Sequence, residues 1–248
     1  MQHFNYSDSP YPIREDFTEA YAKYWETLAR PGSWWTGAQR IAIAQAVRNA
    51  NRCEHCAQRK NALSPYNFPG NHQHDGTLEE IAVDAVHRII TDQNRITQQW
   101  IDDNIDKGLS EEQYVELLGI TVTVFSIDEF NRALGLQLEP LPAPIAGEPD
   151  HYRPAIAQRG TGYVAMLPPR GDFTERESDL WPPNRTANVL RALSLVPDAV
   201  RSWSDVAGAQ YLPMPRMMNF GADTGRSINR MQIEIVAGRV SSISECFY

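Results

Sequence analysis

The chain has 248 residues, with 23 basic and 31 acidic side chains, and therefore a formal net charge of -8 and a pI near 5.3. A protein that tracks phosphates concentrates lysine and arginine on its surface, so this balance disfavours nucleic acid as a partner. Hydrophobic residues make up 42% of the chain, which is enough for the core of one large domain or of two smaller ones.

The chain carries no pattern of membrane targeting. Residues 1–6 lack the basic and apolar regions of a signal peptide, and the longest apolar stretch, residues 117–125, is too short to span a bilayer. We therefore expect a cytoplasmic protein with no membrane partner. Three cysteines are too few for a disulfide scaffold, so in a reducing compartment the close pair Cys53 and Cys56 is expected to be redox-active or metal-binding.

Helix signals recur along the chain. Three segments carry a capping-box pattern, an N-cap Thr or Ser followed three residues later by Gln or Glu: Thr36 with Gln39, Thr77 with Glu80, and Ser110 with Gln113. The third opens an apolar segment that Gly135 can close as a left-handed residue. Residues 120–125 within it are β-branched and alternate like a strand, but the length of the segment and its caps favour a helix. The sequence predicts an all-α fold.

Prolines divide the chain. Five prolines between residues 139 and 154 lack an N–H and disfavour helix in the residue before them: Pro140, Pro142, Pro144, Pro149 and Pro154. Residues 160–184 are also irregular in pattern, and helical patterns resume near residue 185. We therefore predict a helical unit over residues 1–138 that carries the cysteine pair, a linker or arm over 139–184, and a shorter helical unit over 185–248.

The last segment has the pattern of the first cysteine helix. When Cys246 is set opposite Cys53, Asn229 takes the place of the N-cap Thr36, and Gln232 takes the place of Gln39. The apolar positions between them also coincide at helical spacing, as on a buried face. This favours an internal repeat whose second copy has no Cys-x-x-Cys.

Cysteines at 53 and 56 lie on one helical face or across the first turn of a helix, close enough to form a disulfide. The N-terminus of a helix can lower a thiol pKa from about 8.5 to about 7 or below, which favours the reactive thiolate. His55, between the two cysteines, can carry a proton, and the second thiol can resolve a sulfenic acid into a disulfide. The pattern therefore indicates thiol redox chemistry.

Other interpretations of these residues remain open. The two cysteines can be small apolar side chains of a buried helix. They can also bind structural zinc with His72 and His74, although the spacing of these histidines is too short for a usual zinc finger. His87, on the helix predicted over residues 78–90, is either an ordinary core residue or a proton relay near the thiols.

Residues 35–40, the helix over 41–51 and Cys53-Glu54-His55-Cys56 resemble the core motif of alkylhydroperoxidase AhpD-like and carboxymuconolactone decarboxylase-like proteins. Residues 108–114 and 128–135 resemble the helix that follows in that family. The resemblance covers residues 20–138 in outline, and residues 185–248 resemble a shortened second unit. It implies an AhpD-like all-α fold of two related helical units, the second of them incomplete, and subunits that associate into a homo-oligomer.

The resemblance also implies a reaction. A small hydroperoxide would be reduced by the cysteine pair, with Cys56 attacking and Cys53 resolving, and a dithiol or thioredoxin-like donor would recharge the pair without a cofactor or metal. The helix-dipole argument alone would favour Cys53 as the attacking thiol. Alternatives are a non-catalytic helical assembly or binding module, and a decarboxylase-like enzyme that does not use the thiols.

The chain departs from the family at its proton-handling positions. Ile41 stands where the family has a relay glutamate, and Lys60 stands where it has a histidine. Glu234 lies twelve residues before Cys246, as the relay glutamate does before the first cysteine of the family. We therefore expect the relay, or the tuning of the thiol pKa, to come from other candidates: His55, His74, His87, Glu234 and the charge of Lys60.

Overall fold

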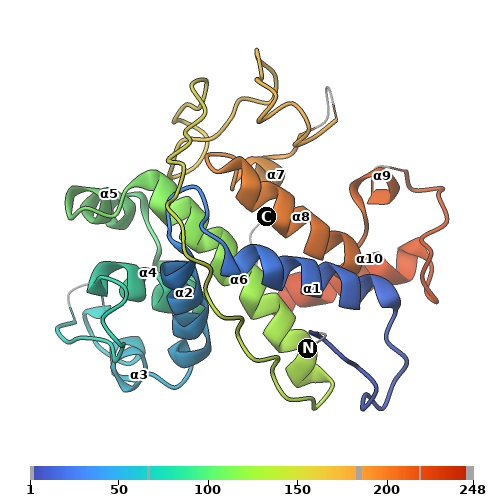
Figure 1. Cartoon of the computed structure of the whole chain (residues 1–248), viewed down its shortest axis with the longest axis horizontal. Coiled ribbons are helices and arrows are strands. Elements are labelled where there is room, and N and C mark those ends of the chain that lie inside the picture. The colour runs from blue at the N-terminus through green and yellow to red at the C-terminus, as the bar shows by residue number, and fades with distance from the viewer. Residues whose placement is uncertain (1–2, 66–67, 183–185, 218, 244–248) are drawn as a thin grey trace.

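The computed structural model describes residues 3–65, 68–182, 186–217 and 219–243 (Figure 1). These residues form ten α-helices and one short 3-10 helix, and they contain no β-strand, only an isolated bridge between Gln158 and Met166. The prediction of an all-α fold is therefore confirmed. The helices are α1 (Glu15–Ala29), α2 (Gly37–Ala50), α3 (Glu54–Lys60), α4 (Glu80–Thr91), η2 (Gln93–Arg95), α5 (Gln98–Asp106), α6 (Glu111–Ala133), α7 (Asn188–Arg191), α8 (Pro197–Gln210), α9 (Met214–Met217) and α10 (Arg230–Ile243).

Two of the predicted capping boxes are present. The Thr36 hydroxyl accepts from the Gln39 N–H at 3.3 Å, and the Gln39 side chain accepts from the Thr36 N–H at 3.0 Å. Ser110 and Gln113 exchange the same bonds at the start of α6. Helix α6 includes residues 120–125 and is followed by Gly135 at φ 72°, as predicted. Local hydrogen bonds thus fix where α2 and α6 begin.

The third predicted capping box is wrong. Helix α4 begins at Glu80 with Glu79 as its N-cap, so Thr77 lies outside the helix. The Glu80 carboxylate accepts instead from the backbone N–H of His72 at 2.8 Å and lies 3.0 Å from His74 Nε2. The Glu80 side chain, which was expected to cap the N-terminus of its own helix, instead binds the preceding loop to that helix.

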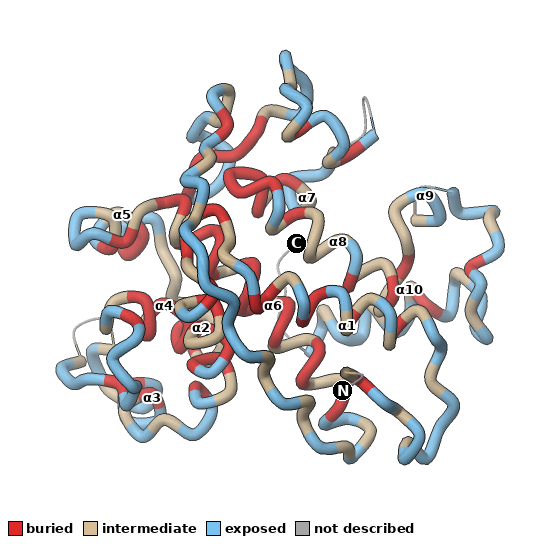
Figure 2. Tube along the Cα trace, viewed as in Figure 1, coloured by how far each residue is buried: buried red, intermediate tan, exposed pale blue. Residues whose placement is uncertain are grey.

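One hydrophobic core holds the helices together. Helices α2, α4 and α6 pack against one another (Figure 1). Helix α8 packs against α6, and α1 packs against both α8 and α2. The buried stretches in Figure 2 follow these helices. The short helix α3 contacts α4 at one edge of this core, so the cysteine pair lies beside a well-packed support.

The proline-rich segment is irregular, as predicted, and runs from the end of α6 across the molecule (Figure 1). Its backbone is bound to the first helical unit: Ile145 N–H donates to Ala29 at 2.7 Å, and His151 N–H donates to Ser33 at 2.8 Å. The Trp25 indole N–H donates to the Pro140 carbonyl at 2.9 Å. The segment is therefore an arm laid on the end of α1.

Helix α10 matches α2 in its cap but not in its packing. Asn229 and Gln232 exchange hydrogen bonds at 2.9 and 3.0 Å, as Thr36 and Gln39 do. The face expected to be buried is exposed, with Val236 and Val240 each 57% accessible. No described element covers this face, so that part of the predicted repeat is wrong, and Cys246 lies outside the described residues.

No helix among the described residues has the length and apolar character that crossing a bilayer requires.

The Thr36 cap gives a direct test of the local structure. Replacing Thr36 with Ala removes the hydroxyl that accepts from the Gln39 N–H and is expected to lower the free energy of unfolding by about 1 kcal/mol. Thr77→Ala is the matched control, because Thr77 caps no helix. Chemical denaturation of both variants checks this, and equal losses of stability in the two would contradict it.

Candidate functional site

The cysteine pair lies at the start of α3. Cys53 is the N-cap residue, with an extended backbone, and Cys56 is in the first turn of the helix. Both are free thiols; Cys53 is half-buried, whereas Cys56 is only 3% exposed. Cys53 is therefore the sulfur that solvent reaches more readily.

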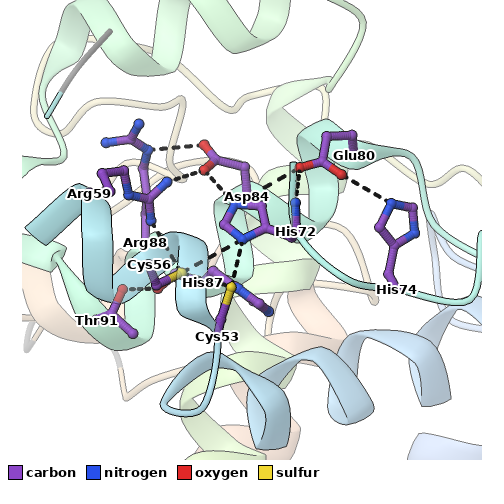
Figure 3. Close-up of polar contacts among 10 residues, drawn as sticks. All are labelled: Cys53, Cys56, Arg59, His72, His74, Glu80, Asp84, His87, Arg88 and Thr91. Carbon is purple, nitrogen blue, oxygen red and sulfur yellow. Dashed lines mark hydrogen bonds and ion pairs between the residues drawn. The ribbon is translucent and has the colours of Figure 1, made fainter. Parts of the chain in front are cut away.

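His72 lies against both sulfurs (Figure 3). Its Nδ1 is 3.4 Å from Cys53 Sγ and 3.7 Å from Cys56 Sγ, and its Nε2 is 3.0 Å from Asp84 Oδ1. The ring belongs to the loop before α4 and is held there by the bond from its backbone N–H to Glu80. One buried imidazole thus connects both thiols to a carboxylate.

Asp84 is the anionic centre of the site. Its carboxylate accepts from the Arg59 guanidinium, from Arg88 Nε at 3.0 Å and from His72. Burial alone would raise the pKa of Asp84, but the hydrogen bond from His72 and the charges of the two arginines hold it well below its ordinary value. Asp84 is therefore a fixed negative charge behind His72.

This charge organises the protonation of the pair. Burial alone would lower the pKa of His72, but its hydrogen bonds to Asp84 and to the two sulfurs raise it to about 10. Burial opposes ionisation of Cys53, yet the hydrogen bond from His72 lowers the pKa of this thiol. The arrangement favours a Cys53 thiolate beside a protonated His72.

His87 approaches the pair from α4. Its Nδ1 is 3.3 Å from Cys56 Sγ, and its Nε2 is buried with no hydrogen-bond partner among the described residues. Burial, together with the nearby His72, lowers the pKa of His87 to about 3, so this ring is neutral. His87, a candidate from the sequence, therefore lies at the thiols.

Of the two neighbouring cations on α3, Arg59 and not Lys60 contacts a sulfur. Arg59 is buried, and its Nη2 donates to Cys56 Sγ at 3.7 Å while its other arm binds Asp84. Lys60 is exposed and lines a hollow beside the pair. Arg59 follows Cys56 by three residues on one helix, and this spacing is the signal that could have identified Arg59 as a neighbour of the thiol.

The other predicted site residues have different partners. His55 stacks on Phe68 with ring centroids 5.4 Å apart and meets the edge of His72 at 4.9 Å, and no hydrogen bond joins it to either sulfur in the part of the chain described. His74 is bound to Glu80. Glu234, on α10, accepts from the Tyr211 hydroxyl at 2.5 Å and pairs with Arg230.

Two open hollows lie at the cysteine pair. One, of about 680 Å³, is lined by both cysteines together with Lys60, Arg95 and Ile243. The other, of about 530 Å³, is lined by Cys53, His55 and His87. Cys53 borders both, so a small molecule can reach its sulfur.

Searches of protein-family models, of curated proteins and of solved structures found no match to this chain. Only the geometry of the site therefore bears on its function.

Proposed function

We propose that Cys53 and Cys56 form a redox pair that reduces small hydroperoxides, with His72 as the group that moves the proton. The observation that carries this proposal is the position of His72 Nδ1, 3.4 and 3.7 Å from the two sulfurs, while Nε2 is bound to Asp84. A carboxylate that orients an imidazole toward a nucleophile is the arrangement of a general acid–base group.

The reaction balances in two steps. The Cys53 thiolate attacks one peroxide oxygen, so that an S–O bond forms and the O–O bond breaks, and the leaving alkoxide takes a proton from His72. His72 then takes the proton of Cys56, whose thiolate attacks the sulfenic sulfur. The S–S bond forms, the S–O bond breaks, and the departing hydroxide takes that proton to leave as water. Two thiols and one hydroperoxide give one disulfide, one alcohol and one water.

This order of attack differs from the one that the family resemblance implies. The half-buried Cys53 borders both hollows, whereas Cys56 is 3% exposed and contacts Arg59 and His87. A peroxide would therefore react with Cys53 first, and Cys56 would then attack the sulfenic sulfur of Cys53. Arg59 supports the Cys56 thiolate during the second step.

An AhpD-like protein of this kind needs an external reductant. A dithiol or thioredoxin-like donor would exchange with the disulfide, attacking the more accessible sulfur of Cys53 and taking up the oxidising equivalents. The exposed apolar face of α10 supports association into a homo-oligomer, since such a face is ordinarily covered by another surface.

The test is a titration of free thiols in the reduced, metal-free protein. One equivalent of hydroperoxide is expected to remove both thiols of the pair and to form a Cys53–Cys56 disulfide, identified by peptide mapping. Cys56→Ser is expected to stop at a sulfenic acid on Cys53, which a dimedone-type probe traps, whereas Cys53→Ser is expected to react far more slowly.

Three results would contradict the proposal. Unchanged thiol counts in the wild type would favour the non-catalytic helical module, with the cysteines as inert packing residues. A sulfenic acid on Cys56 in the Cys53→Ser variant, formed at the wild-type rate, would reverse the order of attack. Hydroperoxide consumption that survives loss of both thiols would favour chemistry of the decarboxylase-like kind.

A further inference from the structure

Four ligating atoms converge beside α3. They are the sulfurs of Cys53 and Cys56 and the Nδ1 atoms of His72 and His87, and all lie within 4.8 Å of one another. From the sequence, zinc binding by the two cysteines with His72 and His74 stayed open as an alternative, although these histidines are too closely spaced for a usual finger, whereas the family resemblance implied no metal. The structure turns His74 away to Glu80 and brings His87 of α4 to the sulfurs, which changes the set of donors.

We propose that the reduced protein binds one Zn²⁺ through Cys53, Cys56, His72 and His87. Two thiolates and two imidazoles are a donor set typical of tetrahedral zinc. With Zn–S and Zn–N bonds of about 2.3 and 2.0–2.1 Å, tetrahedral ligands lie roughly 3.6 Å apart from sulfur to nitrogen. Three of the four S···N separations here are 3.3, 3.4 and 3.7 Å, and the fourth is within 4.8 Å.

Hydrogen bonding alone accounts poorly for this convergence. His72 Nδ1 carries either one hydrogen or one lone pair, so it can make one good bond, yet it faces two sulfurs. His87 directs a third contact at Cys56 while its Nε2 has no described partner. A cation at the common centre uses all four atoms at once.

The surroundings of the four ligands also suit a bound ion. Asp84 holds His72 through Nε2, so that Nδ1 is directed at the sulfurs, as carboxylates orient metal-binding histidines. Two thiolates balance the charge of Zn²⁺, and beside them Asp84 binds the buried Arg59 and Arg88. The ion and its four ligands would therefore be neutral together, which lowers the cost of burying them.

A regulatory role follows, and this part rests on the proposed function. Bound Zn²⁺ would hold both thiolates and slow their attack on peroxide. Hydrogen peroxide oxidises the pair with uptake of two protons, giving one disulfide and two waters, and the ion is released because two of its four ligands are lost. The reduced site would thus store zinc and release it on oxidation.

Metal binding is tested without any oxidant. The full chain, reduced and stripped of metal, is titrated with Co²⁺ as a spectroscopic probe. We expect one Co²⁺ per chain, with sulfur-to-cobalt charge-transfer absorption that Zn²⁺ abolishes by displacement. His87→Ala is expected to lower the affinity for Zn²⁺ by at least about tenfold, and Cys53→Ser is expected to do the same. His74→Ala, the rival histidine, is the matched control and is expected to bind like wild type.

Several outcomes would overturn the site. They are an absence of thiolate–cobalt absorption, unchanged affinity in both His87→Ala and Cys53→Ser, or a loss of affinity in His74→Ala alone. Zinc release is then followed with a chelating dye while peroxide is added to the loaded protein. Retention of the ion through formation of the disulfide would overturn the regulatory part. Because peroxide consumption is measured on metal-free protein, failure of either proposal is seen separately.

Discussion

His72→Gln is expected to slow the oxidation of the cysteine pair by hydroperoxide by about 10²–10⁴-fold, the range for a positioned acid–base group. Glutamine can still bond to Asp84 and to a sulfur, but it cannot take up or release a proton near neutral pH. The wild-type ring contacts both sulfurs, so both steps of the reaction lose their proton carrier. The measurement is the second-order rate constant of thiol loss in metal-free protein under excess peroxide.

His55→Gln is the control for this prediction. His55 lies between the cysteines in the sequence, but in the structure it stacks on Phe68 and meets only the edge of His72. Its replacement is expected to change the rate constant far less than that of His72. A large loss in His55→Gln with a wild-type rate in His72→Gln would assign the proton carrier to His55.

The features that sequence could predict are local ones. Thr36 with Gln39 and Ser110 with Gln113 form caps because the bonded atoms are only three residues apart. The Cys53–Cys56 pair is local in the same way. The capping box predicted for Thr77 and Glu80 was wrong because the Glu80 carboxylate binds the backbone N–H of His72 instead. Nothing in the pattern of residues 77–80 reveals this competing partner.

The rest of the site depends on tertiary packing. Asp84, His87 and Arg88 share one face of α4, and a charged group on an otherwise apolar helix was a usable signal for them. The position of His72 carried no such signal, because a loop sets it and Glu80 holds that loop. The exposure of the apolar face of α10 could not be predicted either, since apolar spacing predicts which residues share a face but not whether another element covers it.

Ile41 and Lys60 stand at the positions where AhpD-like proteins, the family that this sequence resembles, have proton-handling residues. In this chain a different pair of elements supplies such groups at the sulfurs: the loop that carries His72 and the helix that carries Asp84 and His87. On α3, the buried Arg59 and not Lys60 contacts a thiol. The chemistry proposed here therefore depends on α4 as much as on the cysteine motif.

Asp84→Ala is expected to be the most destabilising change at the site. Arg59 and Arg88 are 1% and 5% exposed, and both donate to the Asp84 carboxylate. Removing one member of a buried ion pair costs about 3–5 kcal/mol, because the guanidinium charges left behind stay buried without their carboxylate. The free energy of unfolding of the reduced, metal-free protein, measured by denaturant titration, is expected to fall by that amount.

Asp75→Ala is the matched control, because Asp75 is an exposed aspartate in the loop that precedes the same helix. It is expected to leave stability within about 0.5 kcal/mol of wild type. Asp84→Asn separates charge from packing: it keeps the shape of the side chain but removes the negative charge that holds His72 protonated and the two arginines in place. Full stability in both Asp84 variants would show that the arginines find other partners, and the carboxylate would then have no structural role behind His72.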